Sequence, residues 1–180
     1  MTEPAMEDAV GIVVELAESV WQGFRRDLQD VTPAEAAWRP LPEANSIGLV
    51  VRHLAIEVGW HRAAIERGEP IPSELTEEQQ RQVDRLPLDF DANLRTLDEA
   101  FLGFLAALRS STVATLRERT RAAYKAFEEP ASPHQLALHP VHHLARHWGQ
   151  IRTIRNLYRK TRGEPARFFP NNPSFPRGDG

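Results

Sequence analysis

Apolar residues recur every three or four positions along four long stretches of the chain, which is the spacing of one face of an α-helix. These stretches predict helices over about residues 5–29, 46–67, 89–110 and 133–160. No stretch of useful length alternates polar and apolar residues with the period of two that is typical of a strand. Four amphipathic helices joined by loops favour an all-α four-helix bundle.

The segments between these helices are marked by proline and by polar residues. Three prolines exclude a continuous helix over residues 30–45, where we expect at most one helical turn at 33–37. Residues 68–88 predict an exposed loop with a short helix near 76–83, whereas 111–131 fits either a loop or a short helix. We therefore expect one domain over residues 1–160, followed by a C-terminal tail over 161–180 that is rich in glycine and proline.

Residues that cap helices support these boundaries. Asn45 or Ser46 is a suitable N-cap for the second long helix, and Asp89 or Asp91 for the third. Ser132, followed by a proline, is suitable for the fourth.

Composition then limits the chemistry that is open to the chain. With a formal charge of −3, the chain has no excess of basic residues of the kind that is typical of nucleic-acid-binding proteins. No apolar run reaches the roughly 20 residues that cross a bilayer, and the first ten residues are acidic where a secretory signal is basic. We expect a cytoplasmic protein that binds a small molecule, with neither nucleic acid nor membrane as a partner. Because the chain has no cysteine, a bound metal must be held by histidine and carboxylate.

Seven histidines are present, and five of them fall within residues 134–147. His143 and His147 lie four residues apart on the apolar face of the fourth helix, so their rings project from adjacent turns on one side. His53 lies on an inward stripe of the second helix. If both faces meet inside the bundle, three imidazoles converge on one divalent ion and leave a coordination position open, as in catalytic zinc sites. Imidazole also suits nickel, iron and copper, so the residues leave the metal undecided.

Other polar residues near these histidines have open roles. Glu57, one turn after His53, is a candidate fourth ligand, a base acting on bound water, or a partner that orients an imidazole. Arg146 and Arg152 are candidates to clamp a substrate carboxylate. The basic residues from Arg155 to Lys160 suit the negative end of the helix dipole.

The remaining histidines fit a structural interpretation. We expect His61 at the edge of the core, and three others at the surface or helix start: His134, His139 and His142. The same interpretation extends to the three candidate ligands, which would then be buried and hydrogen-bonded without a metal. Pro140 favours it, since a proline one turn before His143 can kink the helix.

Two sequence segments resemble a known family. NSIG at residues 45–48, followed by His53, and HHLARHWGQI at 142–151 are similar to the DinB/YfiT-like superfamily of bacterial metal-binding bundles. The connection before the second helix, with TPAE at 32–35 and WRP at 38–40, is similar as well. The resemblance covers about residues 5–160 and implies a four-helix bundle, often dimeric, whose zinc or nickel ligands match His53, His143 and His147.

The resemblance also implies an activity. Members include transferases that attach low-molecular-weight thiols such as bacillithiol, mycothiol-dependent maleylpyruvate isomerases and proteins described as hydrolases. We therefore expect a metal-dependent thiol S-transferase with a low-molecular-weight thiol cosubstrate, or a related hydrolase that activates water. The alternative is a non-catalytic, stress-associated bundle whose metal ion holds two helices together.

Overall fold

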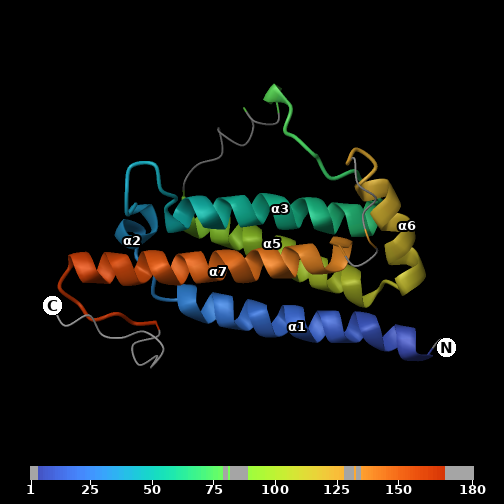
Figure 1. Cartoon of the computed structure of the whole chain (residues 1–180), viewed down its shortest axis with the longest axis horizontal. Helices are drawn as coiled ribbons and strands as arrows, with labels where there is room; N and C mark the ends of the chain where they lie inside the picture. Colours follow the sequence, from blue (N-terminus) through green and yellow to red (C-terminus); the bar gives the residue numbers. More distant parts are fainter. Residues whose placement is uncertain (1–3, 79–80, 82–88, 128–131, 133–134, 169–180) are drawn as a thin grey trace.

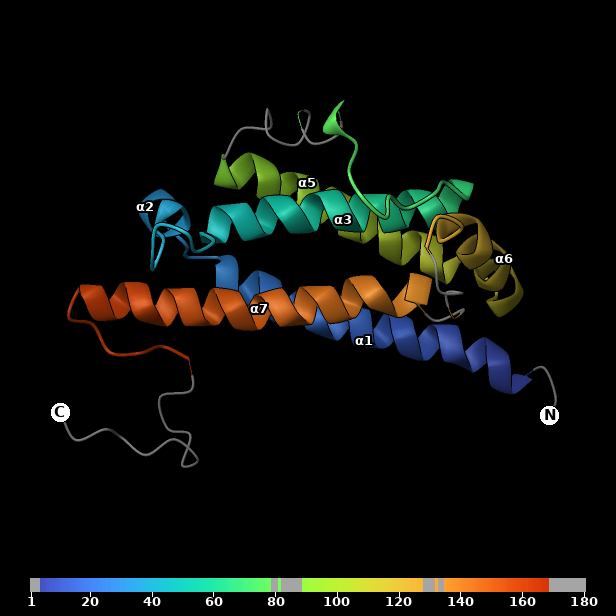
Figure 2. The ribbon, with the colours of Figure 1, turned by 45° about the horizontal axis from the view of Figure 1, so that its top comes forward.

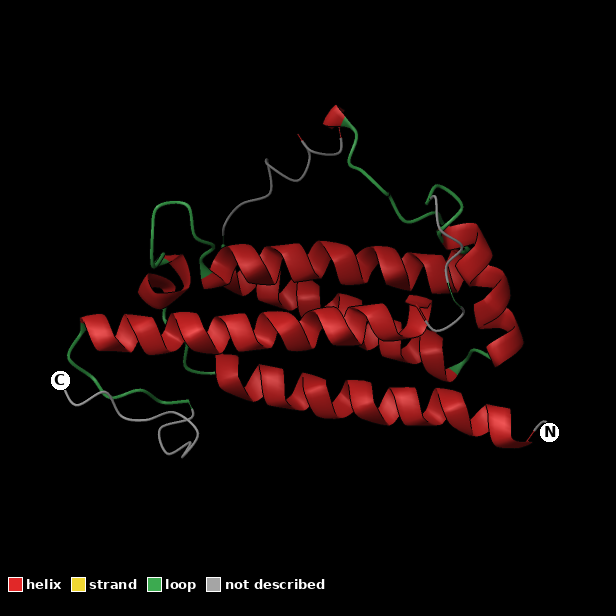
Figure 3. Cartoon of the chain, in the orientation of Figure 1, coloured by secondary structure: helices red, strands yellow, loops and turns green. Residues whose placement is uncertain are grey.

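The computed structural model describes residues 4–78, 81, 89–127, 132 and 135–168. Within these ranges the chain forms helices and no strand (Figure 3), which confirms the predicted all-α bundle. The helices are α1 (Pro4–Leu28), α2 (Pro33–Ala37), α3 (Ile47–Arg67), α5 (Phe90–Arg109), α6 (Val113–Ala123) and α7 (Gln135–Thr161). In this part of the chain, no helix combines the length and apolar character needed to cross a membrane.

The four long helices form the bundle (Figures 1 and 2). α3 packs against α5 and α7, and α1 packs against the same two helices from the other side. In Figure 1, α1 and α7 run in one direction while α3 and α5 run in the opposite direction, so α5 begins at the same end of the bundle as α3. The short helices α2 and α6 cover opposite ends (Figure 1). The candidate ligands lie on α3 and α7, so the antiparallel packing of these two helices decides which of them meet.

Helix boundaries agree with the predicted caps. Ser46 accepts the amide hydrogen of Leu49 at the start of α3, and Asp89 accepts that of Ala92 at the start of α5. The undecided segment after α5 contains a helix, α6, which is capped by Thr112. Of the short helix expected near 76–83, residues 77, 78 and 81 are helical, whereas 79–80 and 82–83 lie outside the described residues. The predicted start of α7 at 133–134 also lies outside them.

α7 continues through Pro140 instead of ending there. The proline removes one backbone hydrogen bond, to the carbonyl of Leu136, but its ring is buried in the core. The helix therefore still presents His143 and His147 toward α3, and Pro140 does not separate these residues from His53.

The core is built from apolar side chains of all four long helices. The largest fully buried ones include Phe24, Ile47, Leu54, Leu97, Phe101, Phe104, Leu136, Leu144 and Ile151. Each such side chain contributes roughly 1.5–3 kcal/mol on burial. This packing fixes the rotation of α3 and α7 about their axes, and so fixes which of their polar residues meet.

Among the residues that the structure describes, one charged side chain is also fully buried. The Arg155 side chain is 2% exposed, and its Nε lies 2.7 Å from Glu35 Oε1 on α2. Its Nη1 lies 3.1 Å from Asp30 Oδ1 in the connection between α1 and α2. Arg155 thus joins the end of α7 to α2, a role that the helix-dipole interpretation of the sequence missed. Asn156, within α7, forms side-chain hydrogen bonds with the backbone of Arg167 and Phe168, which follow the helix. These bonds hold part of the predicted tail against the bundle.

Candidate metal centre

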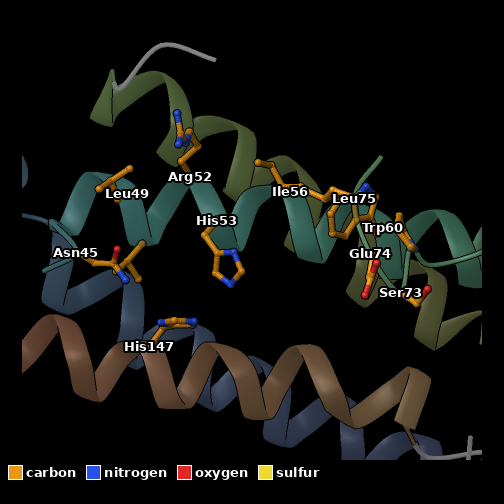
Figure 4. Close-up of a pocket in the computed structure, with 12 residues that line it drawn as sticks. Asn45, Leu49, Arg52, His53, Ile56, Trp60, Ser73, Glu74, Leu75 and His147 are labelled. Carbon is orange, nitrogen blue, oxygen red and sulfur yellow. The ribbon is translucent and has the colours of Figure 1, made fainter. Parts of the chain in front are cut away.

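Three imidazole nitrogens converge between α3 and α7. His143 Nε2 lies 3.3 Å from His53 Nε2 and 2.8 Å from His147 Nε2. Figure 4 shows the His53 ring on α3 and the His147 ring on α7 pointing toward each other across the gap between the two helices. The structure therefore brings together the three histidines that the sequence predicted as ligands.

The separation of His53 Nε2 and His143 Nε2 is the one expected around a divalent ion, whereas the 2.8 Å between His143 Nε2 and His147 Nε2 is shorter. Three nitrogens bound about 2.0–2.1 Å from a tetrahedral zinc ion lie about 3.3 Å apart. Burial lowers the pKa of His53, and the neighbouring His143 and His147 act in the same direction although Glu57 opposes them. Burial likewise lowers the pKa of His147. Both rings are therefore neutral near pH 7 and offer a lone pair, as metal binding requires.

The far side of two of these rings is held by hydrogen bonds. Glu57 Oε2 contacts His143 Nδ1 and lies 3.4 Å from His53 Nε2. His147 Nδ1 donates to Gln150 Oε1 over 2.8 Å. Acceptors at both Nδ1 atoms favour the tautomer whose free Nε2 lone pair faces the centre of the cluster. This contact of Glu57 with His143 Nδ1 is the geometry expected of an orienting partner, one of the three roles left open for this residue.

Glu57 remains ionised in this setting. Its burial opposes ionisation, but hydrogen bonds from His139 and His143 outweigh that effect and place its pKa well below the usual range of a glutamate. A buried carboxylate beside imidazoles raises their basicity, which strengthens their bonds to a cation.

A cavity of about 500 Å³ opens beside two of the three histidines (Figure 4). His53 and His147 form part of its wall. The other polar lining residues are Asn45, Arg52, Ser73 and Glu74, and the apolar ones are Leu49, Val50, Ile56, Trp60, Pro72 and Leu75. The connection after α3 thus forms one wall and α3 itself another. The cluster is open on the side where a ligand could reach it.

Comparison with known proteins identifies the family. The family model described as mycothiol-S-transferase matches residues 15–160. The chain belongs to this family. Since the family is DinB/YfiT-like, the resemblance seen in the sequence is confirmed. Searches of curated proteins and of solved structures give no match.

In this member of the mycothiol-S-transferase family, the two arginines predicted as a substrate clamp are not among the described residues that line the cavity. Arg152 Nε lies 2.6 Å from Asp27 Oδ2 on α1, and its guanidinium lies 4.1 Å from the centre of the Trp148 ring. Arg146 is exposed. Arg152 therefore joins α7 to α1. Among the described residues, Arg52 is the arginine that lines the cavity.

Sequence reasoning missed the role of two other histidines. His139, expected at the surface, has a half-exposed side chain, yet its Nε2 lies 2.8 Å from Glu57 Oε1. His61, expected at the core edge, is 2% exposed and stacks on the His139 ring, with centroids 5.1 Å apart. Burial lowers the pKa of His61 to about 4.

A signal for these residues was present in their spacing. His139 precedes His143 by four residues, as His143 precedes His147, and His61 follows Glu57 by the same interval. Of the other two, His142 is exposed as expected, whereas His134 lies outside the described residues.

Proposed function

We propose that this protein is a metal-dependent S-transferase that joins a hydrophilic, low-molecular-weight thiol of the mycothiol type to an electrophile. The observation that carries the proposal is the convergence of three imidazole Nε2 atoms beside an open cavity. The family description supplies the thiol. We further propose zinc or nickel as the ion, because three imidazoles suit both.

The residues of the chain have distinct parts in this reaction. His53, His143 and His147 would hold the ion, while Glu57 and Gln150 fix the orientation of two of these rings. A divalent ion held by these residues would lower the pKa of a nearby thiol and so supply a thiolate nucleophile. The sulfur then forms a bond to the electrophilic carbon, the leaving group departs with its electron pair, and the thiol proton passes to solvent.

The cavity supports this assignment because its lining mixes polar and apolar groups. Arg52, Asn45 and Glu74 offer charges and hydrogen bonds for a hydrophilic thiol. The ring of Trp60 offers an apolar surface for an electrophile. Such a cavity beside the ligands keeps both reactants close to the ion.

The second candidate is a non-catalytic bundle in which the ion holds α3 and α7 together. The position of the three histidines across these two helices favours it. That role needs no cavity, however, and the volume beside His53 and His147 favours the transferase. A hydrolase would use the same ligands with water in place of the thiol.

The test is a thiol-transfer assay with the full chain, purified without a histidine tag and loaded with zinc or nickel. Mycothiol and 1-chloro-2,4-dinitrobenzene are the substrates, and glutathione is the comparison thiol. We expect saturable turnover that chelation removes and that His147→Ala abolishes. His142→Ala, an exposed residue on the same helix, is the matched control and should retain activity.

Two results would count against the proposal. If protein shown to contain metal reacts mycothiol with the electrophile no faster than the uncatalysed reaction, the transferase is excluded and the non-catalytic bundle is the remaining candidate. Metal-dependent hydrolysis of an ester in the absence of any thiol would indicate the hydrolase.

A further inference from the structure

A second group of potential ligands lies directly beside the three histidines. Glu57, His61 and His139 each present one ligand atom, and these atoms lie within 4.8 Å of one another. Glu57 Oε1 is 2.8 Å from His139 Nε2, and the rings of His61 and His139 are stacked with an interplanar angle of 7°. None of the three atoms is needed to hold the ion proposed above.

The donor set is one that binds transition metals. Two imidazoles and one carboxylate form the ligand set of several catalytic zinc sites. His61 Nδ1 donates to the backbone carbonyl of Glu57 over 2.9 Å, which fixes its tautomer and leaves Nε2 as an acceptor. A histidine that binds a metal is commonly held in this way. His61 Nε2 lies 3.1 Å from the hydroxyl of Tyr124, which can rotate its hydrogen away when a cation takes its place.

The charge of Glu57 is the second observation. This side chain is 8% exposed, and its two carboxylate oxygens face His139 and His143. A buried carboxylate is costly to leave without a full positive charge nearby. A divalent cation at Oε1 would supply that charge.

Access to the group is available as well. The His139 side chain is 51% exposed, so an ion can bind this ring from solvent, 2.8 Å from Glu57 Oε1. Glu57 then serves both positions, with Oε2 on the ring of His143 and Oε1 facing His139.

We propose that Glu57, His61 and His139 form a second divalent-cation site next to the first. Zinc fits its two imidazoles and one carboxylate. The site is weaker than the first, because it has fewer imidazoles and lies close to another cation, and water completes its coordination.

The test measures zinc stoichiometry in the untagged, metal-free full chain, dialysed against increasing free zinc and analysed for metal content. We expect about two zinc ions per chain at saturation, bound in two phases, for the wild type. His139→Gln should lose the weaker phase and retain about one ion, whereas His147→Ala should lose the tighter phase. His142→Ala is the control for binding at exposed histidines and should match the wild type.

The readouts separate this inference from the proposed function. The second site is overturned if the wild type saturates at about one zinc ion per chain. It is also overturned if the wild type binds two ions and the binding isotherm of His139→Gln superimposes on that of the wild type. Neither result affects the proposed transferase. If His139→Gln folds poorly by circular dichroism, the wild-type stoichiometry decides by itself whether a second ion binds, and cobalt absorbance of the wild type with one and two equivalents shows whether it has nitrogen ligands.

Discussion

Replacing Glu57 by glutamine tests how far the buried carboxylate strengthens the metal centre. The substitution keeps the shape of the side chain and an oxygen that can accept from His143 Nδ1, but removes the charge that lies 3.4 Å from His53 Nε2. A hydrogen bond to a charged group contributes about 1.5–3 kcal/mol, against about 0.5–1.5 kcal/mol for a neutral one. We therefore expect the three-histidine site to lose roughly 10–100-fold in zinc affinity, or about 1.4–2.7 kcal/mol.

The assay is competition for zinc against a chromophoric chelator of known affinity, read on the tighter phase of binding. Glu66→Gln is the matched control, since it removes the same charge from an exposed position on the same helix. We expect its zinc affinity to stay within about twofold of the wild type.

Two outcomes would refute the reasoning. Unchanged affinity in Glu57→Gln would show that the carboxylate does not support the ring of His143. Complete loss of zinc from a folded variant would show that Glu57 is itself a ligand of that ion, and not an orienting partner.

Four further predictions concern stability. Gly23→Ala should lower the free energy of unfolding by about 1–3 kcal/mol in urea melts, because its new methyl would lie 2.8 Å from Trp148 Cζ2. Gly11→Ala, with nothing within 4 Å of its new methyl, should be neutral or stabilising, and equal losses in both variants would contradict the argument. Arg155→Ala should cost about 3–5 kcal/mol, since it leaves a buried carboxylate on α2 without its partner; a cost under about 1 kcal/mol would rule this out. In metal-free protein, stability should decline as the pH falls from about 6.5 toward 4, because His61 binds its proton more weakly when folded, with a pKa of about 4. His61→Gln should flatten this decline, and an unchanged pH profile would argue against it. Saturating zinc, at about 1,000 times its Kd, should stabilise the wild type by about 4 kcal/mol in thermal melts, and absence of any shift would mean that the native state binds no zinc.

The sequence alone determined the helices and the three candidate ligands. Periodicity, prolines and caps such as Ser46 and Asp89 act over a few residues, so they can be recognised without knowledge of the partners that each helix meets. The four-residue spacing of His143 and His147 is also a signal that acts over a few residues and can be read within one helix. His53 was recognised in the same way from the inward stripe of its own helix, and the match of two separated segments to a known family supported its grouping with the other two.

Only the tertiary structure decided which polar residues face one another across helices. α3 and α7 are antiparallel, so His53, Glu57 and His61 lie opposite a second series that runs in the reverse order, namely His147, His143 and His139. A shift of one residue in either helix would rotate its side chains by about 100° and break these contacts. The partners of Arg152 and Arg155 could not be predicted from local sequence patterns either, because these acidic residues lie more than 100 residues earlier in the chain. Core packing sets the register and rotation of the helices, and neither quantity is contained in the pattern of a single helix.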